Sequence, residues 1–215
     1  THLAVNELID QGLRNQMRNP QYAYVAPTYG QAKRIAWDIL KGYLKDIPNV
    51  VFNEGELRAD IERPATCDRI RIYLLGAENP DGLRGMYLDG VVLDEFADMN
   101  PTVWTSVVRP LLSDRKGWVL FIGTPKGQNH FYDVLVAAKE NEGTGDWSYA
   151  VYKASETGII DRAELDAARA IMSESEYMQE FECSFTAALV GAYFGKEIEK
   201  AEEEDRICGV PYDLS

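Results

Sequence analysis

Two adjacent acids, Asp94 and Glu95, end an apolar run that starts at Gly90. An apolar run without alternation is typical of a strand that is covered on both faces. In phosphoryl transfer one carboxylate holds Mg²⁺, while a second one beyond it polarises the attacking water. The pair therefore has the form of a Walker B element, with Asp94 as the metal residue and Glu95 as the water-activating residue. Two acids could equally cap a strand where it reaches solvent, and the motif alone does not decide.

A second polar group follows the next apolar run along the chain. Residues 118–122 are apolar and end on Gly123-Thr124-Pro125. Parallel strands end at one edge of a sheet, and ligands bind in the crevice at that edge. The Thr124 hydroxyl could contact a γ-phosphate or its water there, and so couple hydrolysis to movement. Gly-Thr-Pro alone is a plausible turn, but the preceding acidic strand favours the functional interpretation.

Helical and strand patterns alternate along the first 154 residues, which predicts an α/β fold. The expected elements are helix 1–18, strand 22–26, helix 31–44, strands 50–52 and 69–75, the acidic strand, helix 101–112, strand 118–122, helix 129–139 and a last strand, 147–153. Further on, Asp161 and the capping-box pair Ser173 and Glu176 predict two helices. We expect an ATPase core over 1–154, a helical lid over 155–190 and the start of a linker over 191–215.

The composition limits which binding partners and which cellular compartment are plausible for this chain. The chain has 215 residues, 46% of them apolar, and a net charge of -13. Such a charge argues against a generally basic nucleic-acid coat, but it leaves room for a DNA motor with a local basic patch. The three cysteines lack metal-ligand spacing and read as reduced thiols. No apolar run approaches the ~20 residues of a membrane span, so we expect an intracellular protein.

Several segments, taken in order, resemble one known family. They are Val25-Ala-Pro-Thr-Tyr-Gly-Gln-Ala-Lys33, Asn79-Pro-Asp-Gly-Leu-Arg-Gly85, Gly90-Val-Val-Leu-Asp-Glu95, Phe121-Ile-Gly-Thr-Pro-Lys-Gly127, Tyr177-Met-Gln-Glu-Phe-Glu-Cys-Ser-Phe185 and Gly191-Ala-Tyr-Phe194. Together they resemble the ATPase domain of the large terminase subunit of tailed bacteriophages and its junction with a nuclease domain. The resemblance spans nearly the whole chain. The six segments in this order are much more specific than any one of them alone.

The resemblance implies a P-loop NTPase-type, doubly wound, mainly parallel sheet and a motor that hydrolyses ATP with Mg²⁺. Such a motor packs double-stranded DNA into a procapsid in the host cytoplasm. It works with a portal protein and a small terminase subunit, as a homo-oligomeric ring that usually has five members. An isolated fragment is expected to be monomeric and slow.

Two residues take roles only from this resemblance. Thr1 opens a helix and corresponds to the hydroxyl residue that follows Gly-Lys in a Walker A element and binds Mg²⁺. We expect a Gly-Lys pair directly before Thr1. Arg84 lies in a Leu-Arg-Gly context and resembles an arginine finger that completes the ATP site of a neighbouring subunit, an effect of about 10³–10⁵ in rate. Without the family, Arg84 would be interpreted as an ordinary surface arginine, and it could equally contact DNA.

The sequence also bears on DNA contacts and on DNA cleavage. A basic group contains Arg58, Arg63, Arg69 and Arg71, and phosphates could be its targets. Acids are interleaved with these arginines, so a solvated face explains them equally well. The metal-binding acids of the family's nuclease domain follow the linker, and we expect no nuclease activity from this chain.

Two other functions stay open. Asp98 with the acidic pair loosely resembles the Asp-Glu-x-x-Asp box of helicase-type motors, although helicase-type second-domain motifs are lacking. A non-catalytic assembly module that retains the fold is the other alternative, and it would be favoured if no Gly-x-x-x-x-Gly-Lys preceded Thr1.

Overall fold

The computed structural model describes residues 1–186, 200–201, 204 and 206. It divides into two compact units, Thr1–Gly123 and Thr124–Ser215. The expected boundary lay later, after residue 154, and the expected core, lid and linker remain a prediction. Most of the expected linker, 191–215, lies outside the described residues.

The first unit is built on a six-stranded sheet with the order β2-β3-β4-β1-β5-β6. The strands are β1 (Gln21–Ala26), β2 (Val50–Asn53), β3 (Arg58–Arg63), β4 (Asp68–Gly76), β5 (Gly90–Asp94) and β6 (Trp118–Ile122). β4, β1, β5 and β6 are mutually parallel, whereas β2, β3 and β4 form an antiparallel meander. The expectation of a mainly parallel sheet is confirmed.

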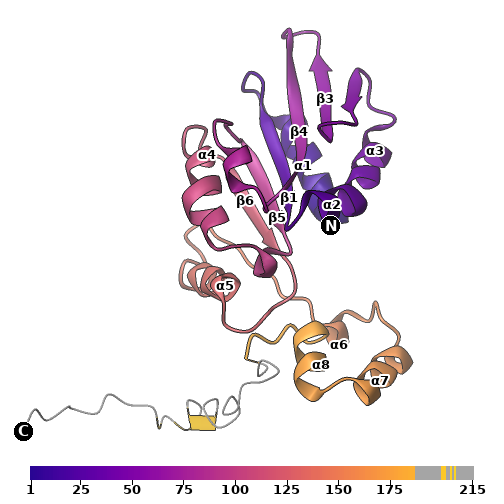
Figure 1. Ribbon diagram of the computed structural model, residues 1–215, viewed down its shortest axis with the longest axis vertical. Helices are drawn as coiled ribbons and strands as arrows, with labels where there is room; N and C mark the ends of the chain where they lie inside the picture. The colour runs from indigo at the N-terminus through magenta and orange to yellow at the C-terminus, as the bar shows by residue number, and fades with distance from the viewer. Residues whose placement is uncertain (187–199, 202–203, 205, 207–215) are drawn as a thin grey trace, which may run out of the picture. The chain divides into compact units, whose positions relative to one another are not determined.

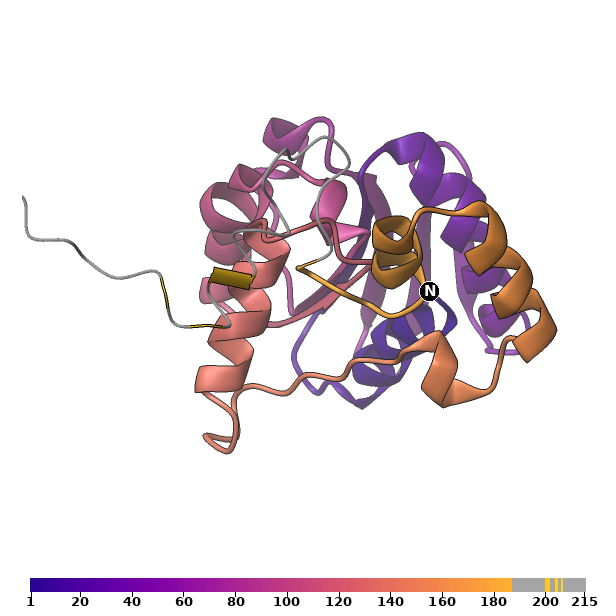
Figure 2. The ribbon, with the colours of Figure 1, turned by 90° about the horizontal axis from the view of Figure 1, so that it is seen from below.

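Helices cover both faces of this sheet, as in a doubly wound fold (Figures 1 and 2). On one face lie α1 (His2–Arg14) and a continuous helix made of α2 (Tyr29–Ala32), a π-helical turn (Lys33–Trp37) and α3 (Asp38–Leu44). On the other lies a π-helical turn (Val103–Val108) that continues into α4 (Arg109–Ser113). Trp104 of that turn packs edge-on against Phe121 of β6. Short 3-10 turns occupy Pro80–Leu83 and Phe96–Asp98.

The core follows from the alternation of side chains along the strands. Tyr22, Tyr24 and Val92 point to the α1 face, where Leu8 and Leu40 are fully buried. The intervening residues Ala23, Val25, Val91 and Leu93 are buried too, on the opposite face. A strand that is buried on both faces needs a continuous apolar run, which is why β1 and β5 are recognisable in the sequence.

The second unit is helical in its described part. It contains α5 (His130–Glu140), α6 (Ala154–Thr157), α7 (Arg162–Ile171) and α8 (Glu174–Glu180). Asn129 and Asp161 cap α5 and α7 through their side chains, and Ser173 with Glu176 forms the expected capping box of α8. The predicted helices are therefore confirmed, and α6 is an additional one.

Two expectations about strands fail. Residues 147–153 do not form a last strand, because Trp147 makes only an isolated bridge to Glu142 and 148–153 are irregular. Conversely, β3 lies in the charged segment for which no strand was expected. In the part of the chain that the structure describes, no helix is long and apolar enough to span a membrane.

Candidate functional site

The carboxyl ends of the parallel strands place the predicted acids at one edge of the sheet. β5 ends on Asp94, between the ends of β1 and β6. Asp94 is 5% exposed, and Glu95 directly after it is half-buried. A buried carboxylate is stable only when hydrogen bonds or charges compensate its lost hydration. The partners of Asp94 therefore define the site.

Thr1, at the start of α1, supplies one of these partners. Its Oγ1 donates a hydrogen bond of 3.1 Å to Asp94 Oδ2. A threonine at this position commonly caps the helix with its side chain, but the Thr1 side chain makes no such cap. The hydroxyl is directed at the acid instead. Thr1 and Asp94 are 93 positions apart in the sequence, and the fold brings them together. Both were expected to belong to one metal site.

Tyr24 of β1 supplies a second hydroxyl, which sequence reasoning missed. Its Oη also donates to Asp94 Oδ2, and the tyrosine is fully buried. Burial raises the pKa of Tyr24, and the hydrogen bond to the Asp94 carboxylate raises this pKa further. The phenol is therefore protonated and a donor throughout the physiological range. A tyrosine inside an apolar strand was the available signal, because a buried phenol needs a partner.

Glu95 has a constrained backbone. Its φ of 55° and ψ of 46° lie in the left-handed region, which is uncommon for a residue other than glycine. Its N–H donates to Asp94 Oδ1 at 3.1 Å. Gly123, just after β6, lies against it, because a β-carbon on Gly123 would be 3.1 Å from the Glu95 Cα. Non-glycine residues in such conformations cluster at functional sites.

The chemistry of this donor set suits Mg²⁺. A carboxylate and a hydroxyl are hard oxygen ligands, and Mg²⁺ is usually held by one or two protein groups together with phosphates and water. Asp94 Oδ2 accepts from both Thr1 and Tyr24, which uses its two lone pairs, whereas Oδ1 accepts from Glu95 N–H and retains one. Within the described residues, no cluster of three or more His, Cys, Asp or Glu could hold a metal by itself.

Comparison with known proteins decides the family. The profile of the large terminase subunit, T4-like-virus type, N-terminal region, matches residues 14–200. The chain belongs to this family. The ATPase domain of the Thermus phage P74-26 large terminase has a similar fold, with a TM-score of 0.68 and 26% identity over 85% of this chain and 82% of that one.

Two terminase relatives extend the comparison. The large terminase subunit of Thermus phage G20c is 53% identical over 60 residues, which is 28% of this chain and 12% of that protein. The large terminase subunit of Escherichia phage T5 is 25% identical over 170 residues, covering 78% of this chain and 38% of that protein. The chain therefore spans well under half the length of these curated relatives.

The two remaining candidate residues, Arg84 and Thr124, lie in different places. Arg84 is exposed and follows the 3-10 turn that ends at Leu83, in the connection between β4 and β5. Thr124 begins the second unit. The roles of both residues remain predictions.

The basic group beside the sheet is largely engaged in ion pairs. Arg58 and Arg71 both bind Asp60 at 3.0 Å, and Arg63 binds Asp68. The side chains of Asp60 and Asp68 are 8% and 1% exposed, so these pairs are built into the β3–β4 hairpin. Three of the four arginines thus have a structural role. Arg69 is exposed and is the member of the group that is best placed to contact phosphates.

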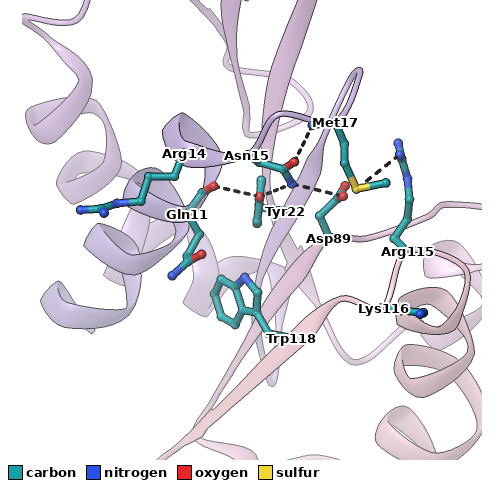
Figure 3. Close-up of a pocket in the computed structure, with 9 residues that line it drawn as sticks. All are labelled: Gln11, Arg14, Asn15, Met17, Tyr22, Asp89, Arg115, Lys116 and Trp118. Atoms are coloured by element: carbon teal, nitrogen blue, oxygen red, sulfur yellow. Dashed lines mark hydrogen bonds between the residues drawn. The ribbon is translucent and has the colours of Figure 1, made fainter. Parts of the chain in front are cut away.

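A hollow of about 250 Å³ lies at the other edge of the sheet (Figure 3). Its lining includes Tyr22, Asp89 and Trp118, which lie at the amino ends of β1, β5 and β6. Asp89 is satisfied there by the Gln21 N–H at 2.9 Å and by the Asn15 amide at 3.3 Å. This hollow is separate from the candidate site, which lies at the carboxyl edge.

Proposed function

We propose that this chain is the ATPase domain of a viral DNA-packaging motor, which hydrolyses ATP with Mg²⁺ to move double-stranded DNA into a procapsid. The observation that carries the proposal is the hydrogen bond from Thr1 to Asp94. It joins the amino end of a 13-residue helix to the acid at the end of β5. Helix amino ends attract phosphate through their free N–H groups and dipole.

The roles follow from this juxtaposition. Thr1 and Asp94 hold Mg²⁺, and the ion neutralises charge that develops on the transferred phosphoryl group. Glu95 orients and polarises the attacking water, and its backbone holds a left-handed conformation directly after Asp94. Thr124 couples hydrolysis to movement. Arg84 completes the site of a neighbouring subunit.

One fold neighbour of this chain has been solved with a bound nucleotide analogue. The large terminase of a thermophilic bacteriophage, whose structure is known in complex with ATP-gamma-S, has a TM-score of 0.65 and 14% identity to this chain. At that identity the likeness concerns the fold. ATP as the nucleotide of this chain therefore rests on the local site and on membership of the terminase family.

The wider assignments belong to the same proposal. The complete subunit would act in the host cytoplasm as a homo-oligomeric ring, with five as the expected number, and would meet a portal protein and a small terminase subunit. We assign no DNA cleavage to this chain. Arg69 is the residue of the basic group that we assign to DNA phosphates, because its three neighbours are committed to Asp60 and Asp68.

The test is Glu95→Gln in the complete subunit, with ATP turnover measured during DNA packaging. The substitution keeps size and hydrogen-bonding capacity but removes the charge, so we expect turnover to fall by at least ~10²-fold while nucleotide still binds. Asp98→Asn is the matched control, because Asp98 is an exposed acid in the next turn. Retained turnover in Glu95→Gln would refute the role of Glu95. Loss of turnover in Asp98→Asn would favour the helicase-type box instead.

A further inference from the structure

Tyr24 carries a hydroxyl where the packing of the core needs none. The side chain is fully buried between the sheet and α1, and a phenylalanine would fill almost the same volume. A buried hydroxyl that lost its partner would be destabilising, because nothing would compensate its lost hydration. Its presence therefore calls for an explanation in terms of what it contacts.

That contact is with Asp94 on the neighbouring strand. The Cα of Tyr24 lies opposite Val92 in the parallel pairing of β1 with β5. From there the phenol reaches forward along the sheet to Asp94 Oδ2, the same oxygen that accepts from Thr1. The partner is a side-chain carboxylate with an assigned role, rather than a main-chain group of the core.

Tyr22 provides the internal comparison. It lies two residues earlier on the same face of β1, and it is also buried, at 1% exposure. Its hydroxyl donates to the main-chain oxygen of Gln11 at 3.1 Å and accepts from the Asn15 amide at 2.8 Å (Figure 3). It therefore ties the end of α1 to the strand, at the edge opposite Asp94. The two tyrosines lie on the same strand and face and are both buried. They differ in the hydrogen-bond partners of their hydroxyls, which belong to α1 and Asn15 for Tyr22 and to Asp94 for Tyr24.

We propose that Tyr24 is a positioning residue that orients the Asp94 carboxylate for Mg²⁺, an inference that rests on the proposed function. Hydrogen bonds from Tyr24 and Thr1 occupy Oδ2, and the N–H of Glu95 leaves one lone pair on Oδ1. The Tyr24 donor comes from a buried strand, so it holds the carboxylate in one orientation before the ion arrives. Partners of this kind typically change metal affinity by about 10–100-fold when they are removed.

The experiment compares Tyr24→Phe with Tyr22→Phe in the complete subunit. The readouts are the melting temperature without nucleotide, the affinity for a fluorescent ATP analogue in EDTA, and the Mg²⁺ concentration that gives half of the Mg²⁺-dependent gain in that affinity. We expect Tyr24→Phe to raise this midpoint by about 10–100-fold without changing affinity in EDTA. Tyr22→Phe should leave the midpoint at the wild-type value, whatever it does to stability.

Each result has a defined meaning. A wild-type midpoint in Tyr24→Phe overturns the inference, even if the melting temperature falls, because a purely structural hydroxyl would behave in that way. If the wild-type subunit shows no Mg²⁺-dependent binding, the proposed function itself fails. Should Tyr24→Phe not fold, 3-fluorotyrosine at position 24, which keeps the hydroxyl and alters its strength as a donor, replaces it. A midpoint equal to that of the same replacement at position 22 overturns the inference.

Discussion

Gly123 lies against the backbone of Glu95, so closely that a β-carbon on Gly123 would be 3.1 Å from the Glu95 Cα and 3.3 Å from the Phe96 nitrogen. Gly123 also has a φ of 151°, which side chains rarely allow. Gly123 of the Gly-Thr-Pro motif must therefore be a glycine, because Glu95, the acid that we assign to water activation, lies too close for a side chain. Gly123, from one motif, and Glu95, from the other, are therefore packed against each other.

Gly123→Ala should displace Glu95 and lower ATP turnover more than it lowers nucleotide affinity. We also expect a loss of stability of about 1–3 kcal/mol from backbone strain, measured by urea unfolding. Gly42→Ala is the control, since a β-carbon on Gly42 in α3 meets nothing within 4 Å. It should stabilise the helix by about 0.5–1 kcal/mol. Normal turnover in Gly123→Ala would contradict the coupling between the two motifs.

Arg84→Ala should reduce turnover of the assembled motor by about 10³–10⁵-fold, the range for an arginine finger. Arg109→Ala, at an exposed site on α4, should have little effect. The sharper measurement mixes Arg84→Ala with Glu95→Gln subunits. If the arginine serves a neighbour, sites with an intact glutamate regain an arginine from the adjacent subunit, and turnover partly returns. A mixture as inactive as its components would assign Arg84 to its own site or to another role.

Acid should remove the stabilising effect of Asp68. The hydrogen bond from Arg63 holds the pKa of Asp68 well below its ordinary value, and the Thr66 hydroxyl lowers this pKa further. A carboxyl whose pKa is lowered by folding stabilises the protein above its unfolded pKa of about 3.9. That contribution disappears as the pH falls through the folded pKa.

Asp68→Asn should therefore be less stable than the wild type at pH ~7, and the difference should narrow below pH ~4. Urea midpoints across this pH range measure the effect. Asp46→Asn is the control, because the Asp46 side chain is 87% exposed. A stability difference for Asp68→Asn that is independent of pH would contradict the assignment of the ion pair.

Gly90→Ala should destabilise the junction of β5 and β6. Gly90 lies opposite Trp118 in the pairing of these strands, and a β-carbon would come within 2.3 Å of the indole. Overpacking of this kind costs about 1–3 kcal/mol. A second substitution, Trp118→Val, should recover part of the loss, as seen in urea unfolding. Additive effects of the two substitutions would show that the indole is not the cause.

The strands that carry the site were predictable from continuous apolar sequence, which in β1 and β5 reflects burial on both faces, whereas β6 is half-buried along its length. β1, β5 and β6 read as apolar runs, and the acids and Gly123 follow them directly. β3 was not predictable in this way. Its charged residues are paired within the strand and with β4, since Asp60 of β3 binds both Arg58 of β3 and Arg71 of β4. Residues 147–153 carry strand-like composition, yet only Trp147 finds a bridging partner.

The candidate site was predictable in its acids but not in its supporting contacts. Asp94 and Glu95 are recognisable from the form of the motif, whereas Tyr24 becomes visible only once β1 is known to pair with β5. The order of strands depends on contacts between distant segments, which local patterns do not encode. The turn at Glu95 likewise requires φ of 55°, although nothing in its residue type favours it.

The central position of β1 has a consequence for biosynthesis. Both of its neighbours, β4 and β5, follow it in the chain, and β5 ends at Asp94. During translation the run Tyr22–Ala26 therefore leaves the ribosome long before either edge can be paired. Nascent strands in this state are prone to aggregate and depend on chaperones. Substitutions that weaken β4 or β5 should accordingly reduce the yield of folded protein in the host before they alter the properties of the molecules that mature.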